Sequence, residues 1–326
     1  MAFKVFVTNK IPESGIKLLK ENGYAVRVYP KHNVISRKEL EQGVKWCDAL
    51  LSLLTNKIDA SLMDLNKNLK VIANYAVGFN NIDIKAATQR KIPVTNTPDV
   101  LTDAVADHAC ALMLSIGRRI VESDKFMRAG KYKGWEPLLL LGSDFKAKTL
   151  GIVGPGRIGN AVAERMYRGF GMSVVYYGVA QNPDMEKLCN AKFMPLNNLL
   201  KQSDFVSIHV PLLKETTHLI STPQLRMMKK TAYLINTSRG PVVDEKALAA
   251  ALKKKQIAGA ALDVFEFEPK MVPGLSKLDN VIVTPHTASA TVQAREGMST
   301  LAAQNIIAAL QGKVPPNLVN KELFGK

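Results

Sequence analysis

Short runs that are apolar at nearly every position recur along the chain, separated by stretches with the 3.6-residue spacing of helices. One series lies at residues 3–9, 25–30, 49–54, 70–75 and 92–96, and a second at 149–154, 173–177, 205–210, 231–237, 258–265 and 281–286. Strands without a polar face are typical of parallel sheets covered by helices on both sides. The pattern predicts an α/β fold with two doubly wound parallel sheets.

Two longer helical patterns mark the organisation between and after these series. Residues 99–130 form a long apolar stretch that follows Pro98, and Asp99 is the expected N-cap. This helix is predicted to open the second domain. The pattern at 291–312 predicts a last helix that could return to the first domain and make it discontinuous.

Length and hydropathy support two domains. The chain has 326 residues, 47% of them hydrophobic, and a mean hydropathy of −0.01. It contains no apolar run near the roughly 20 residues of a membrane span and no signal-peptide pattern at its start. We therefore expect a cytoplasmic protein without a membrane partner. Cys47, Cys110 and Cys189 lack metal-ligand spacing, so reduced thiols and no metal are expected.

The formal net charge of +16 raises the question of a nucleic-acid partner. The lysines are scattered over helical patterns, without interleaved aromatic residues and without an arginine-rich arm. A solvated basic surface is the better interpretation, and no nucleic acid is expected. Such a surface still raises the local concentration of anionic substrates and cofactors.

A glycine-rich loop follows the predicted strand at 149–154. Gly154, Gly156 and Gly159 have G-x-G-x-x-G spacing and precede an amphipathic helical pattern. In this context the first glycine permits a tight turn, the second lets backbone approach a pyrophosphate, and the third allows close helix packing. The loop predicts a dinucleotide site; the alternative is a tight connection that binds nothing.

Three polar residues follow the last strands of the second series: Arg239, His286 and one of the acids Glu266 and Glu268. Ligands of open α/β sheets bind at the carboxyl ends of the strands. A carboxylate helps an imidazole to keep its proton, as a general acid needs, and an arginine binds a carboxylate with two hydrogen bonds. The set suits reduction of a 2-keto acid. Each residue alone has an ordinary structural alternative, and spacing does not choose between the two acids.

With these motifs the chain resembles the D-isomer-specific 2-hydroxyacid dehydrogenase family, most closely its glyoxylate/hydroxypyruvate reductase branch. The motifs follow one another over nearly the whole chain: ANYAVGFNNID, NTPDVLTDAVADHA, LGIVGPGRIG, HVPLLKETTHLI, LINTSRGPVVDEKAL, GAALDVFEFEP and VTPHTASAT. The resemblance implies a homodimer. It also implies a discontinuous flavodoxin-like substrate domain (1–98 and 291–326) and a Rossmann dinucleotide-binding domain (99–290).

The resemblance also assigns individual residues. It implies catalysis by Arg239, Glu268 and His286, and it chooses Glu268 over Glu266. The implied substrate-binding residues are Val77 and Gly78 through their backbone N–H groups, Leu53, Arg295, and Trp135 reaching toward the partner subunit. The implied cofactor-binding residues are Gly154, Gly156, Arg157, Ile158, Gly159, Gly178, Val179, Ala180, Pro211, Thr237, Ser238 and Asp263.

The expected reaction is reduction of glyoxylate or hydroxypyruvate with His286 as the general acid. The alternatives are a 2-ketogluconate-type reductase, a broad D-2-hydroxyacid dehydrogenase and, more remotely, a cofactor-sensing corepressor. Phosphite-oxidising relatives carry a lysine in the loop where Val77 stands here, which argues against that branch. Serine-pathway phosphoglycerate dehydrogenases often carry an added regulatory domain, and this chain is not expected to have one.

Position 178 bears on the choice of cofactor. An acid at the end of the second Rossmann strand would bind the ribose of NAD and repel the 2′-phosphate of NADP. Here Gly178 stands at that position, and no arginine follows it closely. We therefore expect NADP(H) to be favoured weakly and NAD(H) to be accepted.

Overall fold

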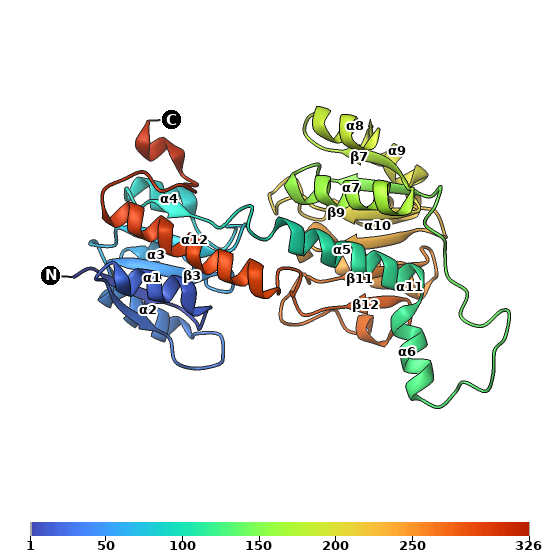
Figure 1. Cartoon of the computed structure of the whole chain (residues 1–326), viewed down its shortest axis with the longest axis horizontal. Helices are drawn as coiled ribbons and strands as arrows, with labels where there is room; N and C mark the ends of the chain where they lie inside the picture. The colour runs from blue at the N-terminus through green and yellow to red at the C-terminus, as the bar shows by residue number, and fades with distance from the viewer. Residues whose placement is uncertain (1, 326) are drawn as a thin grey trace. The chain divides into compact units, whose positions relative to one another are not determined.

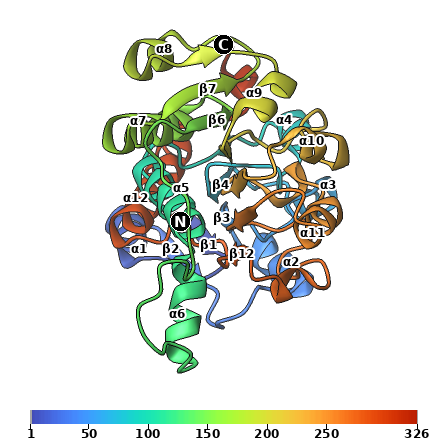
Figure 2. The same ribbon diagram turned by 90° about the vertical axis from the view of Figure 1, so that its right-hand side faces the viewer.

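The computed structural model describes residues 2–325, and its contacts divide the chain into two compact units. Unit 1 comprises Met1–Leu101 and Ala290–Lys326, and unit 2 comprises Thr102–Ser289. The divisions thus fall at 101/102 and 289/290, where the sequence indicated 98/99 and 290/291. Each unit is built around a parallel sheet with helices on both faces, so the predicted fold class is confirmed (Figures 1 and 2).

The sheet of unit 1 has the strand order β2-β1-β3-β4-β5 with every pairing parallel. This order is that of flavodoxin-like folds. Its central strands are buried throughout because both faces are covered. The strands are β1 (Lys4–Val7), β2 (Ala25–Val28), β3 (Ala49–Leu53), β4 (Val71–Tyr75) and β5 (Val94–Thr95).

One face of this sheet packs against two helices that are far apart in the sequence, α1 and α12 (Figure 2). Their close approach needs a glycine, because a Cβ on Gly15 would clash with the backbone of Ser299. The last helix therefore belongs to unit 1. The helices of the unit are α1 (Glu13–Glu21), α2 (Arg37–Trp46), α3 (Ala60–Met63), α4 (Ile84–Gln89), α12 (Val292–Leu310) and the 3-10 turn η3 (Lys321–Phe324).

The sheet of unit 2 has the order β12-β11-β10-β9-β6-β7-β8, again parallel throughout. Numbered from its own first strand, this is the Rossmann order with one added strand. From β6 the following strands are added first on one side of it and then, from β9, on the other. The point between β6 and β9 where the strand order switches is where such folds bind ligands. The strands are β6 (Thr149–Val153), β7 (Ser173–Tyr177), β8 (Lys192–Phe193), β9 (Phe205–Ile208), β10 (Tyr233–Asn236), β11 (Gly259–Leu262) and β12 (Val281–Val283).

Helices cover this second sheet on both faces and enclose two separate cores. Helices α5, α7 and α8 lie on one face, and α9, α10 and α11 lie on the other (Figure 2). The helices are α5 (Thr102–Gly117), α6 (Ile120–Arg128), α7 (Arg157–Phe170), α8 (Pro183–Cys189), α9 (Leu196–Gln202), α10 (Thr222–Met227), α11 (Glu245–Lys253), and the 3-10 turns η1 (Gly240–Val242) and η2 (Leu275–Lys277).

The prediction of one continuous helix over 99–130 is wrong, because the helix breaks at Arg119. The Gly117 carbonyl accepts a hydrogen bond from the N–H of Ser143 at 2.8 Å, and Arg119 adopts a left-handed conformation with φ 52°. A returning segment therefore ends α5, and α6 starts in a new direction. Asp99 does not stand at the N-cap position either: it has φ 68° and lies three residues before α5 begins.

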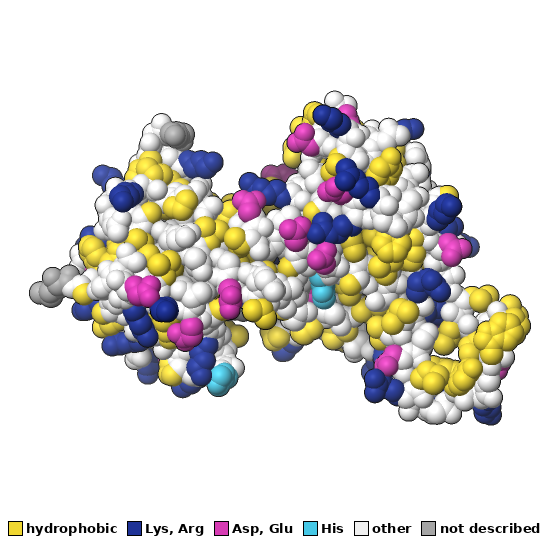
Figure 3. All heavy atoms as spheres, in the orientation of Figure 1, with side chains coloured by type: hydrophobic (Ala, Val, Ile, Leu, Met, Phe, Trp, Pro, Cys, Tyr) yellow, Lys and Arg dark blue, Asp and Glu magenta, His cyan; other side chains and the backbone are white. Residues whose placement is uncertain are grey.

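Surface chemistry follows the expected distribution in two respects. Lysine and arginine side chains are dispersed over the visible face of each unit rather than gathered into one stripe (Figure 3). All three cysteines are free and buried, and burial raises the pKa of Cys47 and Cys110 to about 12. Within residues 2–325, no helix is long and apolar enough to cross a membrane.

Candidate active site

Three neighbouring strands of unit 2 place the predicted catalytic residues at one sheet edge. Strands β10, β11 and β12 end at Asn236, Leu262 and Val283. Arg239, Glu268 and His286 follow these strands in turn. Because the strands are parallel and adjacent, their carboxyl ends meet at the same edge, and the three side chains are delivered there together.

Glu268 and His286 form a direct pair. The imidazole Nδ1 lies 3.0 Å from Glu268 Oε2, and the Phe265 N–H donates to the other carboxylate oxygen at 3.1 Å. Burial raises the pKa of Glu268, but the bonds from His286 and Phe265 and the charge of Arg239 outweigh it, so the pKa lies below its usual value. Glu268 is thus an anion that orients the ring, and Nε2 is the nitrogen left for a ligand.

Arg239 lies near this pair in a loop held by a buried asparagine. Asn236 is 1% exposed and donates to the Arg239 carbonyl at 3.0 Å, while its own oxygen accepts the N–H and hydroxyl of Ser238. The Arg239 guanidinium donates to the Ser238 carbonyl at 2.8 Å. Burial lowers the pKa of Arg239 and the charge of Glu268 opposes that shift. The loop therefore presents a cation beside the Glu268 carboxylate.

The loop that carries His286 depends on Asp263. His286 has φ 55°, and its N–H donates to the Asp263 carbonyl at 2.9 Å. The Asp263 carboxylate is 0% exposed and accepts the N–H groups of Thr287 and Ala288, both at 2.8 Å. Burial raises the pKa of Asp263, but its hydrogen bonds, with the His108 contact foremost, lower it overall.

The resemblance implied that Asp263 binds the cofactor, and the structure shows that its side chain accepts hydrogen bonds from the loop that carries His286. Thr284 also donates to Asp263 at 2.6 Å, and His108 in α5 contacts both, at 3.2 Å to Thr284 Oγ1 and 3.6 Å to Asp263 Oδ1. The carboxylate is thus bonded on both oxygens within unit 2. Sequence reasoning gave His108 no role, because only the fold brings it to this loop.

The rival acid, Glu266, faces a different histidine. Its Oε1 lies 2.7 Å from His218 Nε2, and its Oε2 accepts the Glu245 N–H at 3.2 Å. The geometry therefore separates two acids that spacing could not. Glu268 is the one beside His286.

The glycine loop fits a dinucleotide. Gly154 has φ 100°, and a Cβ there would meet the backbone of His209 and Val210 at 2.8 Å, whereas a Cβ on Gly156 would meet open space. Gly156 is also the N-cap of α7, and no side chain caps this helix. The uncapped N-terminus begins with Arg157 and Ile158, and its N–H groups and dipole suit a pyrophosphate.

Further groups at this edge suit a bound nicotinamide cofactor. The Thr237 hydroxyl is buried and has no hydrogen-bond partner within residues 2–325, as expected of a group reserved for a ligand. Ser238 instead bonds Asn236. Pro211 is exposed and its carbonyl accepts the Thr216 hydroxyl at 2.6 Å.

Gly178 is coupled to the glycine loop by a contact that the sequence did not reveal. A Cβ on Gly178 would lie 2.6 Å from Cδ and 2.8 Å from Cγ of Pro155. These atoms belong to a rigid ring, so neither can give way easily. A side chain at position 178, acidic or otherwise, would therefore require the Pro155 ring or the chain around it to shift. Val179 and Ala180 are exposed beyond it.

The structure places the expected substrate residues of unit 1 in a turn, at a strand end and in the last helix. The Val77 carbonyl accepts from Asn96 and the Gly78 carbonyl from Asn74, at 2.8 and 2.9 Å, while neither N–H has a partner in the described chain. Such a turn can bind an anion. Leu53 ends β3 half-buried, and the Arg295 carbonyl in α12 accepts the Tyr75 hydroxyl at 2.6 Å.

Trp135 lies in the segment between α6 and β6 that has no helix or strand. Its side chain is 81% exposed, and Leu138 and Leu141 nearby are 79% and 60% exposed. This segment projects from unit 2 and carries a dense group of apolar side chains (Figures 1 and 3). An apolar surface of this kind is typical of a contact with another chain.

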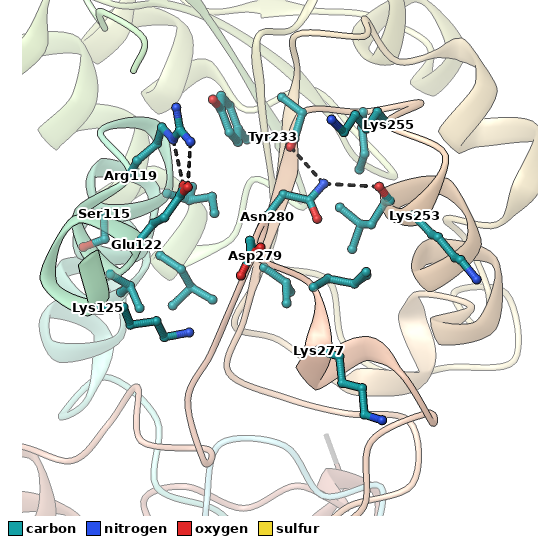
Figure 4. A pocket seen from close by; sticks show the side chains of 18 of the residues that line it. Ser115, Arg119, Glu122, Lys125, Tyr233, Lys253, Lys255, Lys277, Asp279 and Asn280 are labelled. Atoms are coloured by element: carbon teal, nitrogen blue, oxygen red, sulfur yellow. Dashed lines mark hydrogen bonds and ion pairs between the residues drawn. The ribbon is translucent and has the colours of Figure 1, made fainter. Parts of the chain in front are cut away.

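A cavity of about 670 Å³ opens at the opposite edge of the same sheet, where β10, β11 and β12 begin (Figure 4). Tyr233 and Asn280 lie in it, and Arg119 pairs with Glu122 at its side. Lys125, Lys230, Lys253, Lys255 and Lys277 line it. None of the catalytic candidates lies there, so the cavity is distinct from the carboxyl edge.

A flavodoxin-like sheet and a Rossmann sheet in one chain, with an imidazole–carboxylate pair at the same sheet edge as the glycine loop, are the features of a two-unit dehydrogenase. A family model described as the NAD binding domain of D-isomer specific 2-hydroxyacid dehydrogenases matches residues 110–288. The chain therefore belongs to that family, and it is an oxidoreductase that depends on a nicotinamide cofactor.

Individual relatives resemble the chain over its full length. It is 52% identical over 325 residues to a glyoxylate reductase of Thermococcus litoralis, covering 98% of each chain. The structure of the TT0316 protein from Thermus thermophilus matches with a TM-score of 0.91 and 42% identity, over 97% of this chain and 99% of that one. The structure of an NADPH-dependent glyoxylate/hydroxypyruvate reductase from Sinorhizobium meliloti, solved with NADP and malonate, matches with a TM-score of 0.86 and 30% identity. The match covers 100% of this chain and 99% of that one.

Proposed function

We propose that this enzyme reduces glyoxylate or hydroxypyruvate to glycolate or D-glycerate. The observation that carries the proposal is the 3.0 Å pair of His286 and Glu268, with Arg239 beside it, at the edge where the glycine loop lies. The name of the Thermococcus relative supports a small 2-keto acid as substrate.

The residues divide the work as follows. Arg239 binds the carboxylate of the keto acid through two parallel hydrogen bonds. His286 donates the proton on Nε2 to the keto oxygen, while Glu268 on Nδ1 stabilises the protonated ring. The chemistry that a reduced nicotinamide supplies when bound is hydride transfer to the keto carbon. The N–H groups of Val77 and Gly78 bind a substrate carboxylate in this proposal, as the resemblance implies.

The cofactor is proposed to be NADP(H) by preference, with NAD(H) accepted. A carboxylate at position 178 would repel a 2′-phosphate. Gly178 has no side chain, and a carboxylate side chain there would crowd the Pro155 ring. The basic surface favours the more highly charged cofactor. The Sinorhizobium relative is described as NADPH-dependent, which is consistent with this preference.

We also propose a homodimer in which the apolar segment around Trp135 contacts the second subunit. Its three exposed apolar side chains, Trp135, Leu138 and Leu141, support this proposal. Sedimentation of the Trp135→Ser/Leu138→Ser variant should show a larger fraction of monomer than the wild type. An unchanged sedimentation profile would argue against this contact.

Steady-state kinetics on the purified chain test the function. The panel contains glyoxylate, hydroxypyruvate, 2-ketogluconate and a longer 2-keto acid, each with NADH and NADPH. We expect the highest kcat/KM with glyoxylate or hydroxypyruvate and with NADPH. Higher values with 2-ketogluconate, or equal values throughout, would favour the alternative reductases, and no turnover at all would favour the cofactor-sensing role. A tenfold preference for NADH would refute the cofactor proposal.

A further inference from the structure

A buried carboxylate outside the catalytic set closes the loop that carries Glu268. Glu245 is the first residue of α11 and is 3% exposed. Its Oε2 accepts the N–H of Glu266 at 2.8 Å, and its Oε1 accepts the N–H of Val272 at 2.7 Å. One side chain therefore joins the two ends of a seven-residue stretch, with Glu268 between them.

The rest of the loop has few other attachments. A turn within it is closed by the Lys270 N–H to the Phe267 carbonyl at 2.8 Å, and the Phe267 side chain is 56% exposed. Glu266 returns a bond to the Glu245 N–H at 3.2 Å and reaches His218 at 2.7 Å. The loop tip is thus solvated, and its base is anchored to the start of α11.

We infer that Glu245 is a positioning residue for catalysis: by binding both ends of the loop, it fixes the Glu268 carboxylate where it meets His286. The inference rests on the proposed function of the Glu268–His286 pair. One hydrogen bond joins the two side chains, each carried by its own loop, so a small shift of either backbone lengthens it. Displacements of about 1 Å are enough to cost roughly a hundredfold in rate.

A carboxylate is needed at position 245 because both of its partners are donors. A glutamine would accept one N–H and turn its own NH₂ toward the other, leaving a buried backbone donor without a partner. An unsatisfied buried donor destabilises its surroundings by about 1–3 kcal/mol. The Glu245→Gln variant therefore releases one end of the loop with almost no change in side-chain volume.

Asp244 offers a matched control on the same helix. It caps α11 by accepting the Ala247 N–H at 3.0 Å and also accepts the Ser221 hydroxyl at 2.9 Å. Asp244→Ala removes an N-cap worth about 1 kcal/mol without touching the loop ends. It reports what a loss of stability at this helix does to turnover.

The experiment measures kcat, KM, the pH profile of glyoxylate reduction and Tm for Glu245→Gln, Asp244→Ala and the wild type. In Glu245→Gln we expect kcat to fall about tenfold with little change in KM, and the basic limb of the profile to move to lower pH, because the imidazolium loses support. Asp244→Ala should lower Tm and leave both kinetic readouts unchanged.

A double-mutant cycle separates positioning from general destabilisation. If Glu245 acts through Glu268, adding Glu245→Gln to a Glu268→Gln enzyme should change kcat by less than about twofold. A tenfold loss in both backgrounds, or a fall in Tm with kcat and pH profile unchanged, would overturn the inference.

Hydrogen exchange keeps the two proposals distinguishable. Amides of residues 265–272 should exchange faster in Glu245→Gln than in the wild type, whatever the substrate of the enzyme. If the wild type does not reduce glyoxylate, the proposed function is refuted. If the Glu245→Gln amides still exchange faster in that case, the role of Glu245 as loop anchor is nevertheless supported. Unchanged exchange would refute the anchor.

Discussion

The two edges of the unit 2 sheet differ in how their charged side chains are held in place. At the carboxyl edge three carboxylates are tied to named donors: Asp263 holds the His286 loop, Glu245 holds the Glu268 loop, and Glu268 binds the imidazole. At the amino edge five lysines surround the cavity, and among the described residues none of them forms an ion pair. At that edge Arg119 does pair with Glu122, but the lysines stay solvated, whereas the carboxylates of the catalytic edge fix the loops that carry His286 and Glu268.

The largest effect is expected from the imidazole. His286→Ala removes the proton donor, and general-acid catalysis contributes about 10²–10⁴-fold, so kcat for glyoxylate should fall at least about a hundredfold. His32→Ala is the control, since that residue is exposed in a loop of unit 1. Steady-state kinetics at saturating cofactor measure both variants. A loss below about tenfold would argue against this role.

Loss of the Glu268 charge should lower kcat less than loss of His286, and it should also change the pH profile of the reaction. Glu268→Gln keeps the shape of the side chain but removes the charge, so kcat should fall about tenfold or more and the basic limb should move to lower pH. In the wild type the pKa of Glu268 is lowered. Its support for His286 is therefore present above the usual glutamate value of about 4.3 and is lost only as the pH falls below it. An acid limb well above pH 5 would contradict this assignment.

Cofactor choice should respond to two substitutions only when they are made together. Gly178→Asp alone brings a Cβ against the Pro155 ring and should weaken both cofactors. Pro155→Ala/Gly178→Asp removes the clash and should move the ratio of kcat/KM for NADH over NADPH at least about tenfold toward NADH, or roughly 1.4 kcal/mol. Pro155→Ala serves as the control. The same shift with Gly178→Asp alone would refute the coupling.

The smallest effect is expected at the lysine-lined edge. Lys230→Gln/Lys255→Gln/Lys277→Gln removes three solvated charges far from the hydride-transfer chemistry, so kcat should change less than about twofold at 0.15 M salt. The ionic-strength dependence of kcat/KM should become slightly flatter, because the long-range attraction for anions is reduced. A tenfold loss of kcat would show that this edge takes part in turnover.

Local signals explain which parts of the site could be predicted. The glycine loop and the strand-end positions of Arg239 and His286 follow from short patterns whose physical basis is the geometry of one βα turn. Glu245 and His108 had no such signal. Their partners lie 21 and 155 or more residues away in the sequence, and only packing brings them together.

The break at Arg119 and the contact of Gly178 with Pro155 have the same origin. The pattern at 99–130 is helical throughout, yet a bond from Ser143 ends the first helix. The sequence around position 178 does not reveal that the Pro155 ring lies against it and would crowd a side chain there. In both cases a segment distant in sequence competes with the local preference and prevails.

The sequence by itself determined the fold class, the dinucleotide loop and the edge at which catalysis is proposed, because hydrophobic period and glycine spacing act within a few residues. Only the tertiary structure decided which acid faces His286, that Asp263 holds the loop that carries His286, and that a side chain at position 178 would crowd Pro155. Those outcomes depend on distances between side chains from separate strands and helices. No local pattern specifies such distances, because they are set by the packing of the whole unit.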